Sequence, residues 1–249
     1  MQDTGKLAGK TVLITGAARR VGAAVARRLH AEGMRVAIHY RSSSADAVKL
    51  AADLNAARAD SALTVQADLA DLGSLDALIA ASLKWGTLDL LVNNASAFHP
   101  TPFGTVTGQD WDGLMTGNLK APYFLAQAAA PHLKRSHGCI VNMVDIYARR
   151  PLLKHSVYSL TKAGIAALTR SLALELAPEV RVNGVAPGII LWPSQDMDES
   201  ARQRLLDSTA LKRAGSPADI AAAIVYLVRD ADYVTGQTLA VDGGRSIGW

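Results

Sequence analysis

Short apolar segments alternate with helical patterns along the whole chain, and this alternation restricts the possible folds more than any other feature. Apolar runs with few polar interruptions are typical of strands that are covered on both faces, as in a parallel sheet. Strands are predicted at Thr11–Thr15, Arg35–Tyr40, Leu63–Gln66, Leu88–Asn93, Gly138–Val144, Val180–Val185 and Thr238–Asp242. Helices are predicted at Val21–Glu32, Ala45–Ala57, Ser74–Lys84, Ser156–Ala177 and after Pro217, with two more between Gln109 and Arg135.

This order of elements predicts an α/β fold, a doubly wound parallel sheet of the Rossmann type. The 249 residues are 49% hydrophobic, enough for one large core, and no linker or charge run divides them. We therefore expect a single domain over residues 1–249. Ligands of such folds bind at the carboxyl ends of the strands, so the segments that follow the strands hold the functional candidates.

The basic balance of the chain does not indicate nucleic-acid binding. The formal net charge is +4, but arginines occur as scattered pairs, and the 5% of aromatic residues leave little for base stacking. No apolar run approaches the ~18 residues of a membrane span, and the polar start lacks the apolar core of a signal peptide. Cys139, the only cysteine, lies in an apolar strand as a small hydrophobic residue, and no metal site is expected. These features predict a cytoplasmic protein.

The first strand runs directly into a turn that is suited to phosphate binding. The segment Thr15–Gly22 opens a helix, whose N-terminal amides and dipole attract an anion. Gly16 and Gly22 allow a close approach of the backbone, and Arg19 and Arg20 add positive charge. An ordinary strand-to-helix turn is the alternative, since Arg20 stands where the three-glycine spacing needs glycine.

The end of the second strand indicates which dinucleotide would bind. NAD-binding folds of this kind usually carry an acidic residue there, which accepts hydrogen bonds from the ribose 2′-hydroxyl. Here no carboxylate follows the strand until Asp46. Arg41 can hold a 2′-phosphate by charge-assisted hydrogen bonds, and the Ser42 hydroxyl can donate another. A basic solvated loop is the alternative, but the segment His39, Tyr40, Arg41 and Ser42 favours NADPH.

A tyrosine and a lysine on one helix are candidates for proton transfer. Tyr158 and Lys162 share a face of the predicted helix because residues four apart lie above one another. A free tyrosine has a pKa near ~10, and the lysine cation is expected to lower the pKa of Tyr158. Tyr158 would then exchange protons near neutral pH. Taken alone, such a pair is more often a surface tyrosine and lysine of an ordinary helix.

Two more polar residues lie in apolar surroundings. Asp145 follows the fifth strand, where a partly buried carboxyl group could be an acid with a raised pKa or could cap a turn. Asn118 lies within an apolar helical pattern, where its amide could make a structural hydrogen bond or join a proton relay. Both are candidate catalytic residues beside Tyr158 and Lys162.

These segments resemble, in order and spacing, the short-chain dehydrogenase/reductase family along essentially the full chain. The resemblance rests on the glycine-rich turn, Asn93–Ser96, Asn118, the Tyr158 and Lys162 pair, Pro187 with Gly188, and Asp242–Gly244. Together with the residues of the first turn and of the second strand, it implies cofactor contacts from Asp68, Leu69, Asn94, Ala95, Ser96, Tyr158, Lys162, Pro187 and Gly188.

Three departures from the usual family pattern are similar to its pteridine reductase branch. Arg20 and Ser96 each replace a glycine, and Asp145 replaces the serine of the usual triad. The resemblance implies that Phe98 stacks on a pterin ring opposite the nicotinamide. It implies further substrate contacts from Arg20, Ser96, Asp145, Tyr158 and Trp192, the last in a variable substrate loop over about 189–211. The usual assembly of the family, through its fourth and fifth helices and its C-terminal strand, implies a homotetramer.

The expected function is the NADPH-dependent reduction of pterins or dihydrofolate, in which a ring carbon receives hydride and a ring nitrogen receives a proton. A carboxylic acid suits that proton transfer, whereas a ketone reductase uses serine to orient a carbonyl oxygen. A carbonyl reductase, for example of a 3-oxoacyl thioester, is the first alternative, and a non-catalytic NADPH-binding sensor is the second. Asp145 and Phe98 argue against the first; the complete set of Tyr158, Lys162 and Asn118 argues against the second.

Overall fold

A single parallel sheet forms the centre of the molecule. The computed structural model describes residues 5–191 and 198–247. In that part of the chain the strands are β1 Thr11–Ile14, β2 Arg35–Tyr40, β3 Ala62–Gln66, β4 Leu90–Asn93, β5 Cys139–Met143, β6 Arg181–Pro187 and β7 Thr238–Val241. All neighbours pair in parallel, in the order β3-β2-β1-β4-β5-β6-β7, which confirms the predicted doubly wound sheet.

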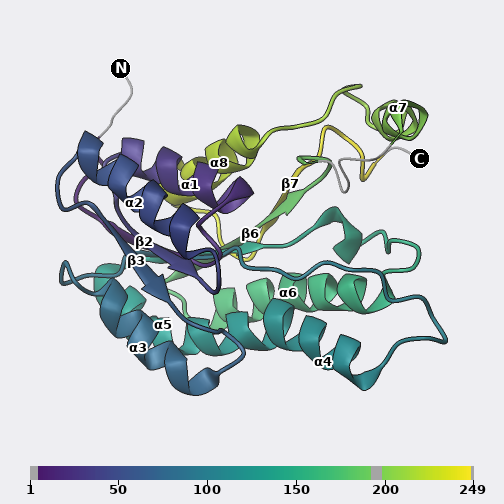
Figure 1. Ribbon diagram of the computed structural model, residues 1–249. Coiled ribbons are helices and arrows are strands. Elements are labelled where there is room, and N and C mark those ends of the chain that lie inside the picture. The colour runs from purple at the N-terminus through teal and green to yellow at the C-terminus, as the bar shows by residue number, and fades with distance from the viewer. Residues whose placement is uncertain (1–4, 192–197, 248–249) are drawn as a thin grey trace.

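Helices cover both faces of this sheet (Figure 1). One layer holds α1 Arg20–Ala31, α2 Ser44–Ala57 and α8 Pro217–Val225. The other holds α3 Leu75–Ser82, α4 Gly108–Met115, α5 Ala121–Ser136 and α6 Ser156–Glu175. Successive strand residues point to opposite faces, so Val12 and Ile14 belong to the core under α1, whereas Leu13 belongs to the core under α5 and α6. The continuous apolar strands of the sequence are thereby explained.

The crevice that holds the functional residues follows from the strand order. β1 and β4 are neighbours, but the chain leaves β1 toward α1 on one face and leaves β4 toward α4 on the other. A doubly wound sheet opens at such a point, beyond the carboxyl ends of its strands. Every segment singled out in the sequence as following a strand meets this edge of the sheet.

Most predicted element bounds agree with the structure to within two residues, and the remaining differences have local causes. A π-helical turn, Thr116–Lys120, joins α4 to α5 without a break. A second one, Tyr226–Asp230, extends α8, and short 3₁₀ turns form at Leu72–Ser74 and Ile146–Ala148. Helix α7, Glu199–Asp207, lies within the segment predicted as a substrate loop and away from the sheet (Figure 1). It buries none of its residues, so the sequence carries no apolar stripe that would predict it.

Among residues 5–191 and 198–247, no helix has both the length and the apolar character of a membrane-spanning helix. Over the same ranges, no group of three or more histidine, cysteine or acidic side chains is placed to hold a metal ion. Burial raises the pKa of the Cys139 thiol to about 11, so it stays protonated and unreactive at neutral pH.

Candidate active site

The glycine-rich turn after β1 is held from below by the end of β4. The Thr15 hydroxyl accepts hydrogen bonds from the N–H groups of Asn94 and Ala95, at 2.9 and 3.0 Å. The Asn94 side chain donates to the carbonyls of Thr15 and Gly16, at 2.8 and 3.1 Å. A Cβ on Gly16 would lie 3.0 Å from the Ala95 Cα, and one on Gly22 would lie 2.5 Å from the Gly16 oxygen. Tight packing therefore requires both glycines.

Arg20 has a strained backbone at the start of α1. Its φ of 53° is in the left-handed region, which costs a residue other than glycine about 1–2 kcal/mol. This explains why glycine is usual at the position. The Arg20 side chain lines the cleft described below, and strain of this kind is typical of functional sites.

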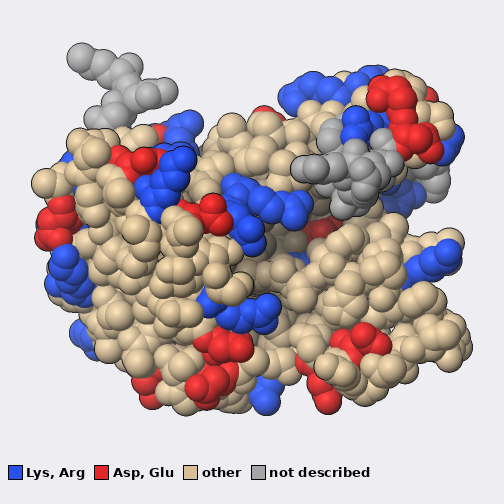
Figure 2. Space-filling model, in the orientation of Figure 1, with Lys and Arg blue, Asp and Glu red and all other residues tan. Residues whose placement is uncertain are grey.

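Two cavities that share part of their walls form a cleft at the carboxyl edge of the sheet. The first, of about 480 Å³, is lined by Arg19, Arg20, Tyr40, Ser42, Asn94, Phe98, Asp145, Tyr158 and Gly188, among others. The second, of about 920 Å³, is lined by His39, Asp68, Leu69 and one side of α4. Both include Gly16, Arg41, Ala95 and Ser96. Figure 2 shows a hollow near the centre of this face, with Lys and Arg side chains around it.

Basic side chains line the part of the cleft next to β2. Arg41 is exposed where the two cavities meet, and its carbonyl accepts a hydrogen bond from Gln66 Nε2 at 3.0 Å, which fixes the loop. Asp46, the first carboxylate after β2, lies 3.6 Å from the Arg19 guanidinium. This exposed ion pair contributes little stability. It does, however, pair the Asp46 carboxylate with Arg19 rather than leaving it at the end of β2.

Half-buried Asp145 and buried Tyr158 and Lys162 form a cluster at the end of β5 and the start of α6. The Tyr158 hydroxyl donates to Asp145 Oδ2 at 2.8 Å. Asp145 Oδ1 accepts the Tyr147 N–H at 2.9 Å and so caps the turn Ile146–Ala148. Lys162 is 3% exposed; its ammonium donates to the Met143 carbonyl at 3.0 Å and lies 5.5 Å from the centre of the Tyr158 ring. Asp145 therefore caps a turn, one of the two roles that the sequence left open, and also accepts a hydrogen bond from Tyr158; its role as an acid stays a prediction.

The expectation that Lys162 lowers the pKa of Tyr158 is wrong for this structure. Burial raises the pKa of the Tyr158 phenol, and the Asp145 carboxylate raises it further because a phenolate beside it would be a second anion. Burial also raises the pKa of Asp145, although its hydrogen bonds and Lys162 oppose this. The pKa of Lys162 is lowered by burial to about 8. Tyr158 is thus a protonated donor, and Asp145 holds a proton more readily than an exposed aspartate.

Asn118 ties the end of β4 to α6. Its side-chain oxygen accepts the Ala97 N–H at 2.7 Å and the Ser96 hydroxyl at 3.2 Å. Its amide nitrogen donates to the Ala97 carbonyl at 2.9 Å and to the Thr161 hydroxyl at 3.2 Å. These contacts are those of a structural amide, and they hold the Ser96 side chain in the wall of the cavity that also contains Tyr158. Asn118 lies in the π-helical turn after α4, a kind of distortion often found at functional sites.

Phe98 forms an aromatic wall at the mouth of the first cavity. Its ring is 48% exposed, stacks on His155 at 4.7 Å between centroids, and meets the edge of the Tyr158 ring at 4.8 Å. The stack with His155 depends on a parallel bridge between Thr101 and His155, which brings the start of α6 to the loop after β4. No local sequence pattern predicts that bridge, so His155 was not among the predicted site residues. Trp192, the predicted residue near the pocket mouth, lies outside the described residues.

The raised pKa of Asp145 leads to a prediction about stability. A group whose pKa is higher in the folded state loses its stabilising contribution as the pH rises through that pKa. Asp145→Asn keeps the shape without the buried charge, so the variant should unfold at a higher temperature than the wild type at pH 8. The difference should shrink toward acid pH, where Asp145 is protonated in both the folded and the unfolded wild type.

Thermal unfolding between pH 4 and pH 8 measures this difference, and Asp71→Asn is a matched control. Asp71 caps the turn Leu72–Ser74 through the Gly73 N–H at 3.0 Å, as Asp145 caps its own turn, but it is exposed. The control should show no gain that grows with pH. A loss of stability in Asp145→Asn that is equal at every pH would contradict the burial argument.

The comparisons with known proteins agree with this architecture. Residues 16–246 match the family model described as enoyl-(acyl carrier protein) reductase. Pteridine reductase 1 of Leishmania tarentolae is 38% identical, with 94% of this chain and 96% of the relative covered. The 3-oxoacyl-[acyl-carrier-protein] reductase FabG of Staphylococcus aureus is 35% identical, covering 94% and 97%, and 3beta-hydroxysteroid dehydrogenase 1 of Eggerthella lenta is 36% identical, covering 97% and 95%. The chain therefore belongs to the short-chain dehydrogenase/reductase family of NAD(P)-dependent oxidoreductases.

Proposed function

We propose that this protein is an NADPH-dependent reductase of pterins and dihydrofolate. The observation that carries the proposal is the half-buried Asp145 carboxyl group, which accepts a hydrogen bond from the Tyr158 hydroxyl at 2.8 Å, at the position where the usual family pattern has serine. A carboxylic acid beside the Tyr158 hydroxyl is a second proton source. It suits the reduction of a ring C=N bond, because the ring nitrogen must be protonated while the adjacent carbon receives hydride.

The donors along the cleft suit a phosphorylated dinucleotide. Arg19, Arg20 and Arg41 give three guanidinium groups at the walls of the two cavities, and Ser42 adds a hydroxyl. Guanidinium groups hold phosphate in a bidentate, charge-assisted manner. Asp68 and Leu69, in the larger cavity, are assigned to the adenine end, and Pro187 and Gly188, at the end of β6, to the nicotinamide end.

The residues of the cluster then divide the proton transfer between them. NADPH held in the cleft would supply the hydride, and Tyr158 would give its proton to the ring nitrogen. The phenolate left behind would stand against the Asp145 carboxylate, so transfer is easiest when Asp145 itself is protonated and passes its proton on to Tyr158. Burial, which raises the pKa of Asp145, increases the population of that state. The Lys162 ammonium, which lies over the face of the Tyr158 ring, offsets the negative charge of the phenolate.

The wall formed by Phe98 supports a flat aromatic substrate. One face of its ring is covered by His155, and its partly exposed remainder lines the cavity that contains Tyr158 and Asp145. A pterin ring stacked there would be within reach of the Ser96 hydroxyl and the Arg20 guanidinium, which line the same cavity. The ring quadrupole favours an offset stack of this kind.

Reduction of a carbonyl substrate is the second candidate. The similarity to a 3-oxoacyl-[acyl-carrier-protein] reductase and to a hydroxysteroid dehydrogenase favours it. Against it, the cluster offers no serine hydroxyl at position 145 to orient a carbonyl oxygen. A non-catalytic NADPH sensor is disfavoured by the hydrogen-bonded Asp145 and Tyr158 pair, which cofactor binding alone does not need.

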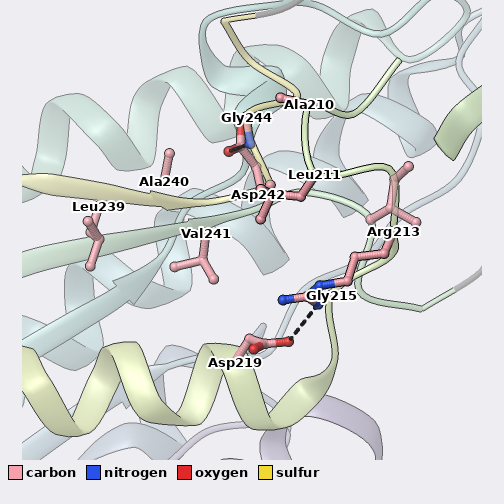
Figure 3. Close-up of a pocket in the computed structure, with 12 residues that line it drawn as sticks. Ala210, Leu211, Arg213, Gly215, Asp219, Leu239, Ala240, Val241, Asp242 and Gly244 are labelled. Atoms are coloured by element: carbon pink, nitrogen blue, oxygen red, sulfur yellow. Dashed lines mark hydrogen bonds and ion pairs between the residues drawn. The ribbon is translucent and has the colours of Figure 1, made fainter. Parts of the chain in front are cut away.

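Exposed apolar side chains support assembly into a homotetramer. Tyr123 on α5 and Leu160 and Leu174 on α6 are exposed in the single chain. β7 is an edge strand within the described residues, and Leu239 on it is exposed. A groove beside β7 has a volume of about 410 Å³. Figure 3 shows its lining, with Leu239 and Val241 on β7 and the ion pair between Arg213 and Asp219 of α8. Uncovered apolar surface of this kind is typical of subunit contacts.

Replacement of Asp145 tests the proposed reaction. Asp145→Asn should reduce the rate with dihydrobiopterin or dihydrofolate by about 10²–10⁴-fold, the usual contribution of a positioned general acid. NADPH affinity, followed by the fluorescence of NADPH, should stay close to that of the wild type.

Asp145→Ser should also lose pterin reduction and gain weak activity on simple ketones, and Tyr158→Phe should be at least as damaging as either Asp145 variant. The rates are measured as NADPH oxidation, with an acetoacetyl thioester as the competing substrate. If wild type reduces that thioester far faster than any pterin, the proposal is wrong.

Cofactor selection is tested at Arg41. Arg41→Asp removes a phosphate partner and adds a like charge, so NADPH affinity should fall by roughly ten- to hundredfold, while NADH affinity should change far less or improve. The matched control is Arg135→Asp, an equal change of charge at an exposed arginine at the end of α5. Equal effects of the two substitutions on the ratio of NADPH to NADH affinity would rule out Arg41 as the selector.

Light scattering tests the assembly. The wild type should have four times the mass of one chain at micromolar concentration. Leu239→Lys should split the tetramer into smaller species, because it places a charge on the β7 surface. Val48→Lys, which changes a similarly exposed apolar residue on α2, should leave the tetramer intact. A stable, active monomer of the wild type would overturn the proposal.

A further inference from the structure

His39 holds the phosphate-binding turn through both its backbone and its ring. It lies near the end of β2, and its side chain is 2% exposed. Its carbonyl accepts the Ala17 N–H at 2.9 Å, and its ring Nδ1 lies 3.1 Å from the Gly16 nitrogen. The other ring nitrogen, Nε2, lies 3.1 Å from the carbonyl oxygen of Ala67, just after β3. Two successive amides of the turn are therefore engaged with His39 rather than directed at a ligand.

These contacts define the protonation state of the ring. The Gly16 N–H can only donate, so Nδ1 must accept and carries no proton. The Ala67 carbonyl can only accept, so Nε2 must carry the hydrogen and donate it. His39 is thus neutral, in the Nε2–H form, and it connects the turn after β1 to the end of β3. A buried ring with both nitrogens satisfied has little freedom to move.

We propose that His39 is a positioning residue for the cofactor, and that its neutral ring fixes the glycine-rich turn in the conformation that binds phosphate. The proposal rests on the assignment of the cleft to NADPH. It differs from the role expected from the sequence, in which His39 belongs to the loop that contacts the 2′-phosphate. Here His39 acts through Gly16, and the 2′-phosphate contacts are left to Arg41 and Ser42.

Protonation of the ring would break this arrangement. The imidazolium has an N–H on both nitrogens, so the bond at Nδ1 would become a contact between two donors, with the Gly16 N–H left unsatisfied. Burial lowers the pKa of His39, while the hydrogen bond to Ala67 and the Asp68 carboxylate oppose that shift. Arg35 on β2 and Arg41 just after it are the nearest cations along the chain. The loosening of the turn is therefore confined to pH values below the ordinary histidine pKa of ~6.5.

Three substitutions separate the two hydrogen bonds. In His39→Asn the side-chain oxygen sits where Nδ1 was and can accept from Gly16, but the contact with Ala67 is lost. In His39→Gln the terminal NH₂ sits where Nε2 was and can donate to Ala67, but the acceptor for Gly16 is lost. His39→Leu loses both. Thermal unfolding of each variant reports the purely structural loss.

The expected result at pH 8 is an asymmetry in NADPH affinity. His39→Asn should bind NADPH within about threefold of the wild type, whereas His39→Gln and His39→Leu should bind roughly ten- to hundredfold more weakly, as for the loss of one hydrogen bond at a buried donor. The rate at saturating NADPH should change little in all three. Equal losses of affinity in the Asn and Gln variants would overturn the proposal, since a structural role does not distinguish the two bonds.

The pH dependence gives a second comparison. Wild-type affinity for NADPH should fall below about pH 6 more steeply than that of His39→Asn, which has no ring to protonate. The 2′-phosphate of NADPH itself titrates near pH ~6, but it does so equally with both proteins, so the difference between them isolates the ring. Parallel curves for the two proteins would contradict the proposed role.

A measurement without cofactor keeps the result separate from the assignment to NADPH. Nitrogen NMR of the wild-type imidazole should give an unprotonated Nδ1 and a protonated Nε2 at pH 8. Amide exchange of Gly16 should quicken in His39→Gln and His39→Leu but not in His39→Asn. If these results hold and the wild type binds no NADPH, the proposed function fails, while the proposal that His39 fixes the glycine-rich turn is retained. A wild-type ring protonated at Nδ1 would overturn the inference itself.

Discussion

The reversal of strand order between β1 and β4 is the constraint on which the rest of the structure depends. Because the chain leaves these two parallel strands toward opposite faces, their ends must meet in an open crevice. Their backbones are held together there by the Thr15 hydroxyl and the Asn94 side chain, which between them satisfy four polar groups of the two turns. His39, on the adjacent strand β2, accepts hydrogen bonds from two amides of the same turn. The cleft is thus a consequence of topology, made rigid by a small number of polar contacts.

A second constraint is the burial of charge beside that crevice. Lys162 is buried and Asp145 is half-buried, and this loss of solvent disfavours the charged form of each, raising the pKa of the acid and lowering that of the base. Their mutual attraction opposes both shifts, and Tyr158 shares a hydrogen bond with the acid. The three groups therefore titrate as a coupled set rather than as independent residues. A cluster of this kind gains the proton mobility that catalysis needs by giving up part of its contribution to stability.

The fold could be predicted almost completely from the sequence because the central strands of the sheet are buried. Burial on both faces makes Val12, Leu13 and Ile14 one apolar run, and the same holds for the other central strands. Where an element buries little, as in α7, the sequence carries no comparable signal. The π-helical turn at Thr116–Lys120 was missed for another reason. The helix continues through it without a break, so no residue pattern marks where it begins or ends.

The candidate site could be predicted as a set of residues but not as a set of interactions. Helical spacing paired Tyr158 with Lys162, the family resemblance added Asp145, and the structure brings the three side chains together. The sign of the pKa shift of Tyr158 could not be derived in this way, because it depends on the depth of burial and on which group receives the hydrogen bond. His155 could not be found at all, since its contact with Phe98 depends on a bridge between distant segments.

Three residues of the cleft break local rules, and this supports a functional site independently of resemblance. Arg20 holds a backbone conformation that favours glycine, Lys162 is a buried cation, and Asp145 is a half-buried acid. Each of these choices lowers the stability of the folded chain relative to an ordinary residue at the same place. Strain and buried charge that meet in one crevice are typical of a site that is maintained for its chemistry.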